Sequence, residues 1–179
     1  MKREWQTLDK KLIYENQWLK LYEDKVIQPN GLEGIYSYLD KGKGVFVIAQ
    51  DKDQGIYMLE EYRYVIKKSV IQLPAGGSKD KDTMNDAKRE LKEETGIMAK
   101  TWKFLGNFYV APGHETATID VYLATDLDTS NIKISEQEED ESILDIKKIS
   151  LEKLKEMIRA NKIECGITLA ALNLFFVVK

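Results

Sequence analysis

Residues 71–97 read IQLPAGGSKDKDTMNDAKRELKEETGI, in which an apolar strand, a Pro-Ala-Gly-Gly turn, a polar loop and a charged helix follow one another. The helix is predicted from about Thr83 to Thr95, with Asp82 or Thr83 as its N-cap. Gly96 is expected to end it, because glycine readily adopts the left-handed conformation that follows a helix. Three apolar residues at helical spacing predict the face that packs on the core, namely Met84, Ala87 and Leu91.

Three glutamates predict the chemistry of this helix. Glu90 shares a helical face with both Glu93 and Glu94, although like charges at these spacings destabilise an isolated helix. One interpretation is a solvated acidic face that neighbouring basic residues neutralise. The other is a Mg²⁺ site, because Mg²⁺ takes oxygen ligands and often shares its coordination shell with substrate phosphates. The glycine-rich turn favours the second interpretation, since backbone there can approach a metal and a phosphate closely.

Residues 89–97, RELKEETGI, resemble the second half of the Nudix box, G-x5-E-x7-R-E-U-x-E-E-x-G-U with U an aliphatic residue. All the defined positions of that half are present. The first half departs from the pattern, because the spacing between Gly76 and Arg89 is one residue short and contains no glutamate. In the family that glutamate mainly buttresses the box arginine. The resemblance therefore implies that Asp82 or Asp80 takes its place.

The resemblance implies an α/β (α+β) fold, a Nudix-type α/β/α sandwich with a mixed sheet. It also implies a Mg²⁺ site, with Mn²⁺ as a possible substitute. Glu90, Glu94 and the Ala75 carbonyl would hold the ions, Glu93 would share or bridge them, and Gly76 would lie against the substrate. The number of ions stays open.

The catalytic base of the resembling group is a glutamate on a loop before a late strand. In this chain that place is occupied by the acidic run 136–141, EQEEDE. On composition alone the run would be a solvated loop. The resemblance implies Glu139 or Glu141 as the base, and we favour Glu139, with Glu141 reaching a metal.

Pro112 lies sixteen residues after Gly96 and resembles the proline that marks the ADP-ribose pyrophosphatase group. Without the box it would be an ordinary turn residue. The group usually has a glutamate five residues after the proline, where this chain has Ala117, and Glu115 lies two positions early. The resemblance implies that Pro112 and Glu115 contact the substrate. His114 in the same segment has a turn or substrate role that stays open.

Three further residues are candidates for binding the nucleotide. Arg63 matches the arginine that the group places against phosphates or the base, a task that suits its planar fork. The alternative is a surface arginine paired with Glu60 or Glu61. Trp18 and Tyr22 are candidates for stacking on adenine, and ordinary packing is an equally good interpretation of both.

Composition narrows the class of protein. The 179 residues, 43% of them hydrophobic, suit one domain with a sizeable core. The net charge of -3 and the pI near 5.4 argue against binding to a nucleic-acid backbone. The single cysteine, Cys165, excludes an internal disulfide and suits a cytoplasmic protein. The N-terminus has no apolar run of a signal peptide, and the apolar stretch 167–178 is too short to span a membrane.

The order of the predicted strands and helices divides the chain into two regions. Residues 1–42 form an antiparallel strand extension that we expect to build a homodimer, and residues 43–179 form the Nudix hydrolase domain. The segment 44–49, GVFVIA, is expected as a buried central strand. Later strands near residues 103–109, 118–124 and 143–149 precede helices near 151–161 and 168–177.

The predicted function is Mg²⁺-dependent hydrolysis of a nucleoside diphosphate derivative, with ADP-ribose first among substrates and AMP and ribose 5-phosphate as products. One alternative within the same class is another nucleotide sugar, such as GDP-mannose, or an oxidised nucleoside diphosphate. An alternative of another class is a non-catalytic Nudix-like nucleotide sensor. The intact Glu90, Glu93 and Glu94 favour the enzyme.

Overall fold

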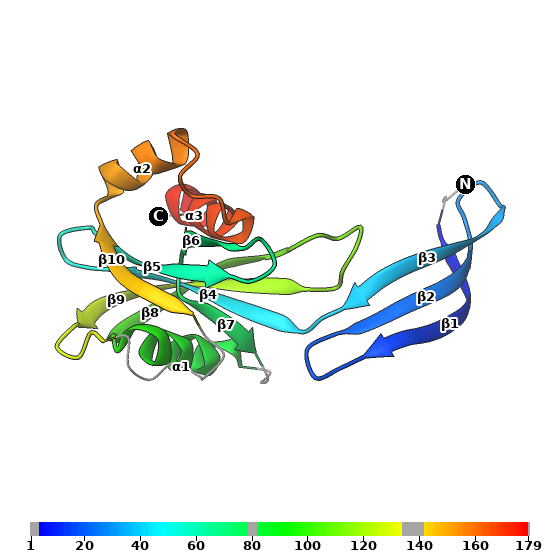
Figure 1. The fold of residues 1–179 in the computed structure, drawn as a ribbon, viewed down its shortest axis with the longest axis horizontal. Coiled ribbons are helices and arrows are strands. Elements are labelled where there is room, and N and C mark those ends of the chain that lie inside the picture. The colour runs from blue at the N-terminus through cyan, green and yellow to red at the C-terminus, as the bar shows by residue number, and fades with distance from the viewer. Residues whose placement is uncertain (1–3, 79–81, 134–141, 179) are drawn as a thin grey trace. The chain divides into compact units, whose positions relative to one another are not determined.

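The computed structural model describes residues 4–78, 82–133 and 142–178, which contain ten strands and three helices (Figure 1). In chain order these are β1 Gln6–Glu15, β2 Lys20–Ile27, β3 Glu33–Asp40, β4 Lys43–Gln50, β5 Ile56–Arg63, β6 Lys68–Gln72, β7 Ala75–Ser78, α1 Thr83–Thr95, β8 Met98–Tyr109, β9 Thr118–Asp128, β10 Ile143–Ile149, α2 Leu151–Arg159 and α3 Gly166–Val178. The chain forms two compact units, one of residues 1–43 with 108–118 and one of residues 44–107 with 119–179.

The first unit contains an antiparallel sheet in the order β1-β2-β3. The side chain of Asn16 shapes the turn between β1 and β2, because its Oδ1 accepts hydrogen bonds from the N–H groups of Trp18 and Leu19. The turn between β2 and β3 contains Gly31 with φ of 85°, a conformation that glycine adopts without strain. Both turns are therefore encoded by the residues within them.

The segment 108–118 completes the first unit by pairing with β3. The Leu39 N–H donates to the His114 carbonyl at 2.9 Å, and the Thr116 N–H donates to the Leu39 carbonyl at 3.0 Å. The hydroxyl of Thr116 also donates to Asp40 Oδ1 at 2.7 Å. The loop that contains Pro112 is thus fixed to the sheet through its backbone.

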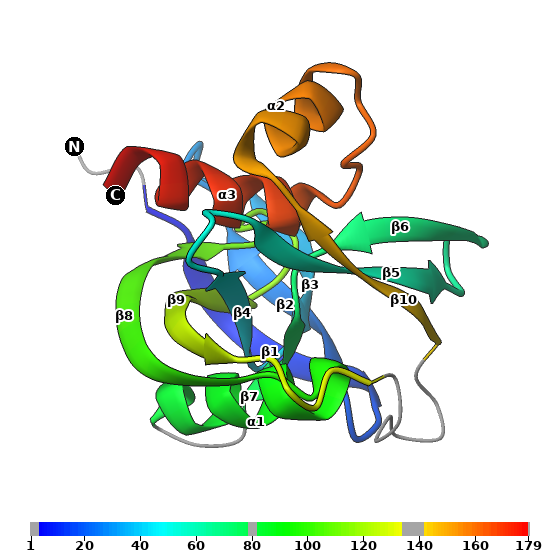
Figure 2. The same ribbon diagram turned by 90° about the vertical axis from the view of Figure 1, so that its left-hand side faces the viewer.

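The second unit contains a sheet in the order β10-β5-β4-β9-β8, with β6 paired to β5 and β7 paired to β4. Helix α1 covers one face of this sheet, and α2 and α3 cover the other (Figure 2). Residues 45–50 of the central strand β4 are all buried, as the apolar run 44–49 predicts. The predicted α/β/α sandwich with a mixed sheet is confirmed.

The core beneath α1 joins the helix to the sheet. Ala87 and Leu91 of α1 are buried there, and Met84 packs against their cluster. The predicted apolar stripe is therefore the face that contacts the sheet. Its partners come from β4, β5, β9 and the connection between α1 and β8, namely Val45, Val47, Ala49, Tyr57, Tyr122, Ala124 and Ile97.

Both predicted ends of α1 are confirmed. Asp82 is the N-cap, and its Oδ1 accepts a hydrogen bond from the Met84 N–H at 3.2 Å. Gly96 follows the helix with φ of 72°, and its N–H donates to the Lys92 carbonyl.

The expected Pro-Ala-Gly-Gly turn is wrong. Residues 75–78 form the short strand β7, which pairs with β4, and the Val47 N–H donates to the Pro74 carbonyl at 2.9 Å. Proline and two glycines read locally as a turn, but pairing with a strand distant in the chain decides their conformation. Among the described residues, no helix has the length and apolar character needed to cross a bilayer.

Candidate active site

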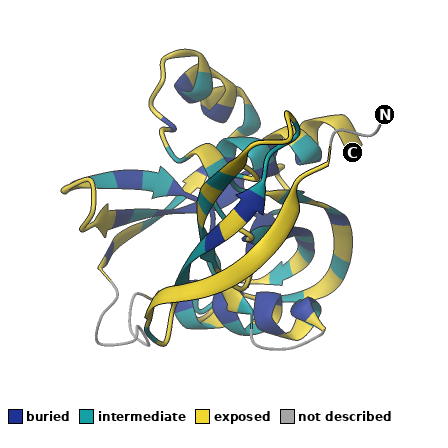
Figure 3. Cartoon of the chain, turned by 90° about the vertical axis from the view of Figure 1, so that its right-hand side faces the viewer, coloured by how far each residue is buried: buried dark blue, intermediate teal, exposed yellow. Residues whose placement is uncertain are grey.

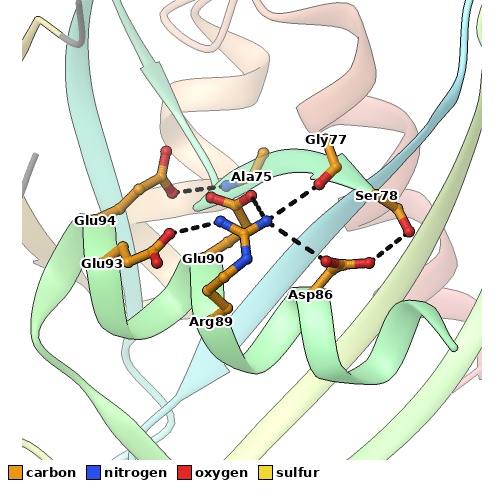
Figure 4. A network of polar contacts seen from close by, with 8 residues as sticks. All are labelled: Ala75, Gly77, Ser78, Asp86, Arg89, Glu90, Glu93 and Glu94. Carbon is orange, nitrogen blue, oxygen red and sulfur yellow. Dashed lines mark hydrogen bonds and ion pairs between the residues drawn. The ribbon is translucent and has the colours of Figure 1, made fainter. Parts of the chain in front are cut away.

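Three carboxylates form one face of α1. Asp86, Glu90 and Glu94 are spaced four residues apart, so they lie on the same side of the helix. They are only 6%, 6% and 3% exposed. Figure 4 shows them pointing toward β7. A row of buried carboxylates is costly unless each group has partners.

Arg89 gathers several of these carboxylates. One guanidinium nitrogen donates to Glu93 Oε2 at 2.6 Å, and the other donates to Glu90 Oε1 at 2.6 Å (Figure 4). The second nitrogen also lies 3.5 Å from Asp86 and donates to the Gly77 carbonyl at 3.3 Å. Burial lowers the pKa of Arg89, but the charge of Glu90 and the hydrogen bonds to Glu93 and Glu90 outweigh burial and raise the pKa. The arginine therefore stays charged and holds these side chains in place.

Strand β7 supplies backbone and hydroxyl partners to the same helix face. The Ala75 N–H donates to Glu94 Oε2 at 2.8 Å, and the Ser78 hydroxyl donates to Asp86 Oδ2 at 2.6 Å. At Gly76 a Cβ atom would overlap the carboxyl group of Glu90. The glycine thus allows the backbone to lie directly against a buried carboxylate.

The donor set of this site fits a hard divalent cation. Buried carboxylate oxygens lie against backbone that carries no side chain at Gly76, and Mg²⁺ prefers oxygen ligands. Within residues 4–78, 82–133 and 142–178, no three His, Cys, Asp or Glu side chains are already arranged to hold one ion. Instead, Glu90 and Glu93 bind Arg89, while Glu94 binds the Ala75 N–H.

Arg63 lies at the end of β5 in a network with two buried residues. It binds Glu61 Oε1 at 2.8 Å and donates from Nε to Gln72 Oε1 at 3.1 Å. Gln72 in turn donates to Glu61 Oε2 at 2.6 Å. Burial raises the pKa of Glu61, and the charge of Arg63 opposes that shift. The pairing of Arg63 with Glu61, which was the alternative to a role in substrate binding, is present, while 45% of the arginine side chain stays exposed.

The first unit contains the other candidates for substrate binding. Trp18 is 68% exposed in the turn between β1 and β2. Tyr22 stacks on Tyr38 with ring centroids 5.5 Å apart, and Lys10 Nζ lies 4.1 Å from the Tyr22 centroid. Tyr22 therefore already has an aromatic and a cationic neighbour.

Pro112 and Glu115 lie together in the loop that pairs with β3. Glu115 forms an ion pair with Lys41 at 3.2 Å. Both residues line the same cavity of the first unit, together with His114. The acidic run with Glu139 and Glu141 lies outside the described residues.

Comparison with known proteins identifies the family. The model of the NUDIX domain matches residues 40–165, and that of the nucleoside diphosphate sugar hydrolase N-terminal domain matches residues 5–39. The chain is a Nudix hydrolase. The ADP-ribose pyrophosphatase of Bacillus subtilis is 28% identical over 161 residues, which are 89% of this chain and 86% of that protein. The methanol dehydrogenase activator of Bacillus methanolicus is 30% identical over 171 residues, 95% of this chain and 91% of that protein.

A solved structure shows the same Nudix fold. The crystal structure of an ADP compounds hydrolase superposes with a TM-score of 0.83 at 18% identity, covering 96% of this chain and 92% of that one. At this identity the likeness concerns the fold.

The Nudix box arginine has a partner that the box pattern does not contain. Asp82 caps the helix through the Met84 N–H, and Asp80 lies outside the described residues. Asp86, three residues before Arg89, lies beside the guanidinium and also binds Ser78. The sequence signal for Asp86 as a neighbour of Arg89 was its spacing of four residues from Glu90, which puts both carboxylates on one face of the helix.

Proposed function

We propose that this Nudix hydrolase cleaves the pyrophosphate bond of a nucleoside diphosphate derivative in a Mg²⁺-dependent reaction. ADP-ribose is the first candidate substrate, with AMP and ribose 5-phosphate as products. The observation that carries the proposal is the row of buried carboxylates on α1, held against the glycine-containing strand β7. The name of the relative from Bacillus subtilis, an ADP-ribose pyrophosphatase, supports this substrate.

The proposed metal ligands are Glu90, Glu94 and the Ala75 carbonyl, with Glu93 shared between ions. Mn²⁺ is a possible substitute for Mg²⁺. When bound, the cation neutralises phosphate charge and lowers the pKa of a coordinated water. The protein's own contribution is to hold the carboxylates ready, since Arg89 binds Glu90 and Glu93 and the Ala75 N–H binds Glu94.

Substrate binding is proposed for Gly76 and Arg63 of the second unit. A residue without a side chain at position 76 lets the substrate approach the backbone. Glu61 and Gln72 orient the Arg63 fork, whose exposed part suits phosphate oxygens or a base. Arg63→Ala is expected to raise KM more than it lowers kcat.

Further substrate contacts are proposed for Trp18, Tyr22, Pro112 and Glu115 of the first unit. Trp18 presents an exposed ring, which supports stacking on a base. Tyr22 keeps this proposed role only if a base displaces one of its present neighbours, Tyr38 or Lys10.

Glu139 is proposed as the general base, with Glu141 reaching a metal. General-base catalysis typically contributes about 10²–10⁴-fold. Glu139→Gln is therefore expected to lower kcat by this order while Mg²⁺ affinity, measured by calorimetry, changes little. If Glu141→Gln has this effect and Glu139→Gln does not, the assignment of the base is reversed.

Residues 1–42 are proposed to build a homodimer and residues 43–179 to form the hydrolase domain. Exposed apolar side chains of the N-terminal sheet support the dimer. Small nucleotide substrates, rather than nucleic acid or a membrane, are the proposed partners, and the single cysteine supports a place in the cytoplasm.

The substrate is tested by coupled phosphate release from ADP-ribose, GDP-mannose, UDP-glucose, ADP-glucose and oxidised dGDP, each with Mg²⁺ and with EDTA. We expect Mg²⁺-dependent turnover that is fastest with ADP-ribose. A different best substrate would keep the chemistry and replace the substrate assignment. Nucleotide binding by calorimetry without any turnover would favour the sensor.

A further inference from the structure

Arg89 binds two of the carboxylates that are proposed to bind the metal. Its Nη1 donates to Glu93 Oε2 at 2.6 Å, and its Nη2 donates to Glu90 Oε1 at 2.6 Å (Figure 4). A guanidinium has only hydrogen-bond donors and stays positively charged. A cation that binds Glu90 and Glu93 therefore competes with Arg89 for their oxygens.

Asp86 offers Arg89 another carboxylate. Its Oδ1 lies 3.5 Å from Nη2, whereas an N–H···O hydrogen bond is usually about 2.7–3.2 Å long. The contact of Nη2 with the Gly77 carbonyl, at 3.3 Å, is also longer than its contact with Glu90. A shift of the guanidinium by about 0.5 Å toward Asp86 would bring that pair to ordinary hydrogen-bond length.

The Asp86 carboxylate is held in place. The Ser78 hydroxyl of β7 donates to its Oδ2 at 2.6 Å, and only 8% of the side chain is exposed. A buried carboxylate is costly unless it is paired with a positive charge or hydrogen-bonded. A closer contact with Arg89 would therefore stabilise Asp86 and the guanidinium together.

We propose that Asp86 receives the guanidinium of Arg89 when Glu90 and Glu93 bind a divalent cation. Asp86 is thus a positioning residue, which does not bind the ion but lowers the cost of releasing its two ligands from their ion pairs. The proposal rests on the proposed function, because it requires the metal site on α1. It goes beyond that function, since the Nudix box pattern leaves position 86 undefined.

The probe is Mn²⁺, titrated into the full-length protein without substrate, because the EPR signal of the free ion reports binding without turnover. Asp86→Asn keeps an oxygen that accepts from Ser78 but removes the charge that attracts Arg89. We expect the dissociation constant for Mn²⁺ to rise on the order of tenfold, because a charge-assisted hydrogen bond is lost from the metal-bound state.

The melting temperature in EDTA distinguishes this role from a structural one. There Arg89 keeps Glu90 and Glu93, and its contact with Asp86 is long in that arrangement. Asp86→Asn should therefore melt close to the wild type in EDTA, although it binds Mn²⁺ more weakly.

Asp82→Asn is the matched control. Asp82 lies one turn before Asp86 and caps α1, and asparagine caps a helix about as well as aspartate. The variant removes the same charge from the same helix, at a residue that the box resemblance favoured as the partner of Arg89. It should bind Mn²⁺ as the wild type does.

Arg89→Gln separates transfer of the guanidinium from a simple loss of negative charge. A carboxylate that attracts the ion directly does so with or without Arg89, whereas one that receives the guanidinium has no role once Arg89 is replaced. In the Arg89→Gln background, Asp86→Asn should therefore weaken Mn²⁺ binding by less than about twofold.

The proposal is overturned by unchanged Mn²⁺ affinity in Asp86→Asn, by an equal loss in Asp82→Asn, or by a loss of the same size in the Arg89→Gln background. If Asp86→Asn does not fold, Asp86→Ala takes its place, because alanine suits a helix interior. These results would leave the proposed function standing. Absence of saturable Mn²⁺ binding by the wild type would overturn both proposals.

Discussion

Glu94 places a carboxyl group in a nearly fully buried position in the last turn of α1, where the Ala75 N–H donates to it. Glu94→Gln keeps an oxygen that can accept this hydrogen bond but removes the charge. We expect kcat with Mg²⁺ to fall by orders of magnitude while the melting temperature changes little. Glu152→Gln, on the exposed first turn of α2, is the control and should have normal kcat. Near-normal activity of Glu94→Gln would contradict a role for α1 in metal binding.

Asp86 shows which part of a site is hard to predict at the residue scale. The glutamates of α1 were found because their spacing matches a known pattern. Asp86 binds Ser78 and lies beside Arg89, yet the pattern directs attention to the loop before the helix. Its partners come from β7 as well as from its own helix, so only the folded chain shows that Asp86 takes part.

At the scale of elements, the contact between β7 and α1 depends on a glycine. A Cβ at Gly76 would overlap the Glu90 carboxyl, whereas a Cβ at Gly77 would meet no atom within 4 Å. Gly76→Ala is therefore expected to lower the free energy of unfolding by about 1–3 kcal/mol and to reduce kcat by displacing Glu90. Gly77→Ala is the matched control and should change stability by less than about 0.5 kcal/mol. The free energy of unfolding in urea and kcat are measured for both variants. Equal losses in Gly76→Ala and Gly77→Ala would refute the close contact between Gly76 and Glu90.

The ends of α1 were predictable, whereas β7 was not, and the difference is physical. Asp82 and Gly96 act through the backbone of residues two to four positions away, so the local sequence contains the signal. The pairing of β7 with β4 depends on a strand that lies far away in the chain. Strand propensity is weak for the sequence Ala-Gly-Gly-Ser, and tertiary pairing overrides it.

An ion-pair cluster connects β10 to the turn between β4 and β5. Lys148 Nζ lies 2.6 Å from both Asp51 Oδ2 and Asp53 Oδ2. Hydrogen bonds from Lys148 are the main cause that lowers the pKa of each aspartate below its ordinary value of 3.8. A folded-state pKa below the unfolded value means that this stabilisation is present above that value and is lost as the pH falls through the folded-state pKa.

Lys148→Met should therefore be less stable than the wild type at pH 7, and the difference should shrink as the pH falls below 3.8. Urea unfolding of the wild type and of Lys148→Met, at pH values from 7 to below 3.8, measures this difference in stability. Lys153→Met is the control, because Lys153 pairs with Glu156 on the exposed surface of α2, where solvent screens the pair, and it should show a smaller change of the difference with pH. A difference in stability between wild type and Lys148→Met that stays constant with pH would refute the coupling between Lys148 and the two aspartates.

At the scale of the whole molecule, the order of elements followed from the alternation of apolar runs and turn residues, because each run must bury one face. What could not be predicted was how segment 108–118 joins the N-terminal sheet. That segment pairs with β3 through Leu39, a contact between distant parts of the chain. The positions of Pro112 and Glu115 are therefore fixed by pairing with the sheet of residues 6–40. Their distance in sequence from the Nudix box, which identified them as candidates, does not contain this information.

The N-terminal sheet leaves large apolar side chains exposed, which argues for association between copies of the chain. Strand β1 is exposed along its whole length (Figure 3), and its Leu8 and Leu12 are 55% and 45% exposed. On β3, Ile35 is 65% exposed. Leu12 is in register with Tyr22 and Ile35 with Lys25, so the two side chains lie on opposite faces of the sheet. We expect the face of Ile35 to form the interface, because burial of exposed apolar surface drives most protein association.

Ile35→Glu would place a charge in that interface, and the resulting desolvation cost should convert a wild-type homodimer into a monomer. Residue 35 lies on the opposite face of β3 from Tyr36, so the change should leave intact the cavity that Tyr36, His114 and Glu115 line. Leu144→Glu, at a residue of β10 that is 56% exposed, is the matched control and should remain a dimer. Sedimentation velocity over a range of concentrations measures all three proteins. A wild-type monomer at every concentration, or a dimeric Ile35→Glu, would exclude this sheet as the interface.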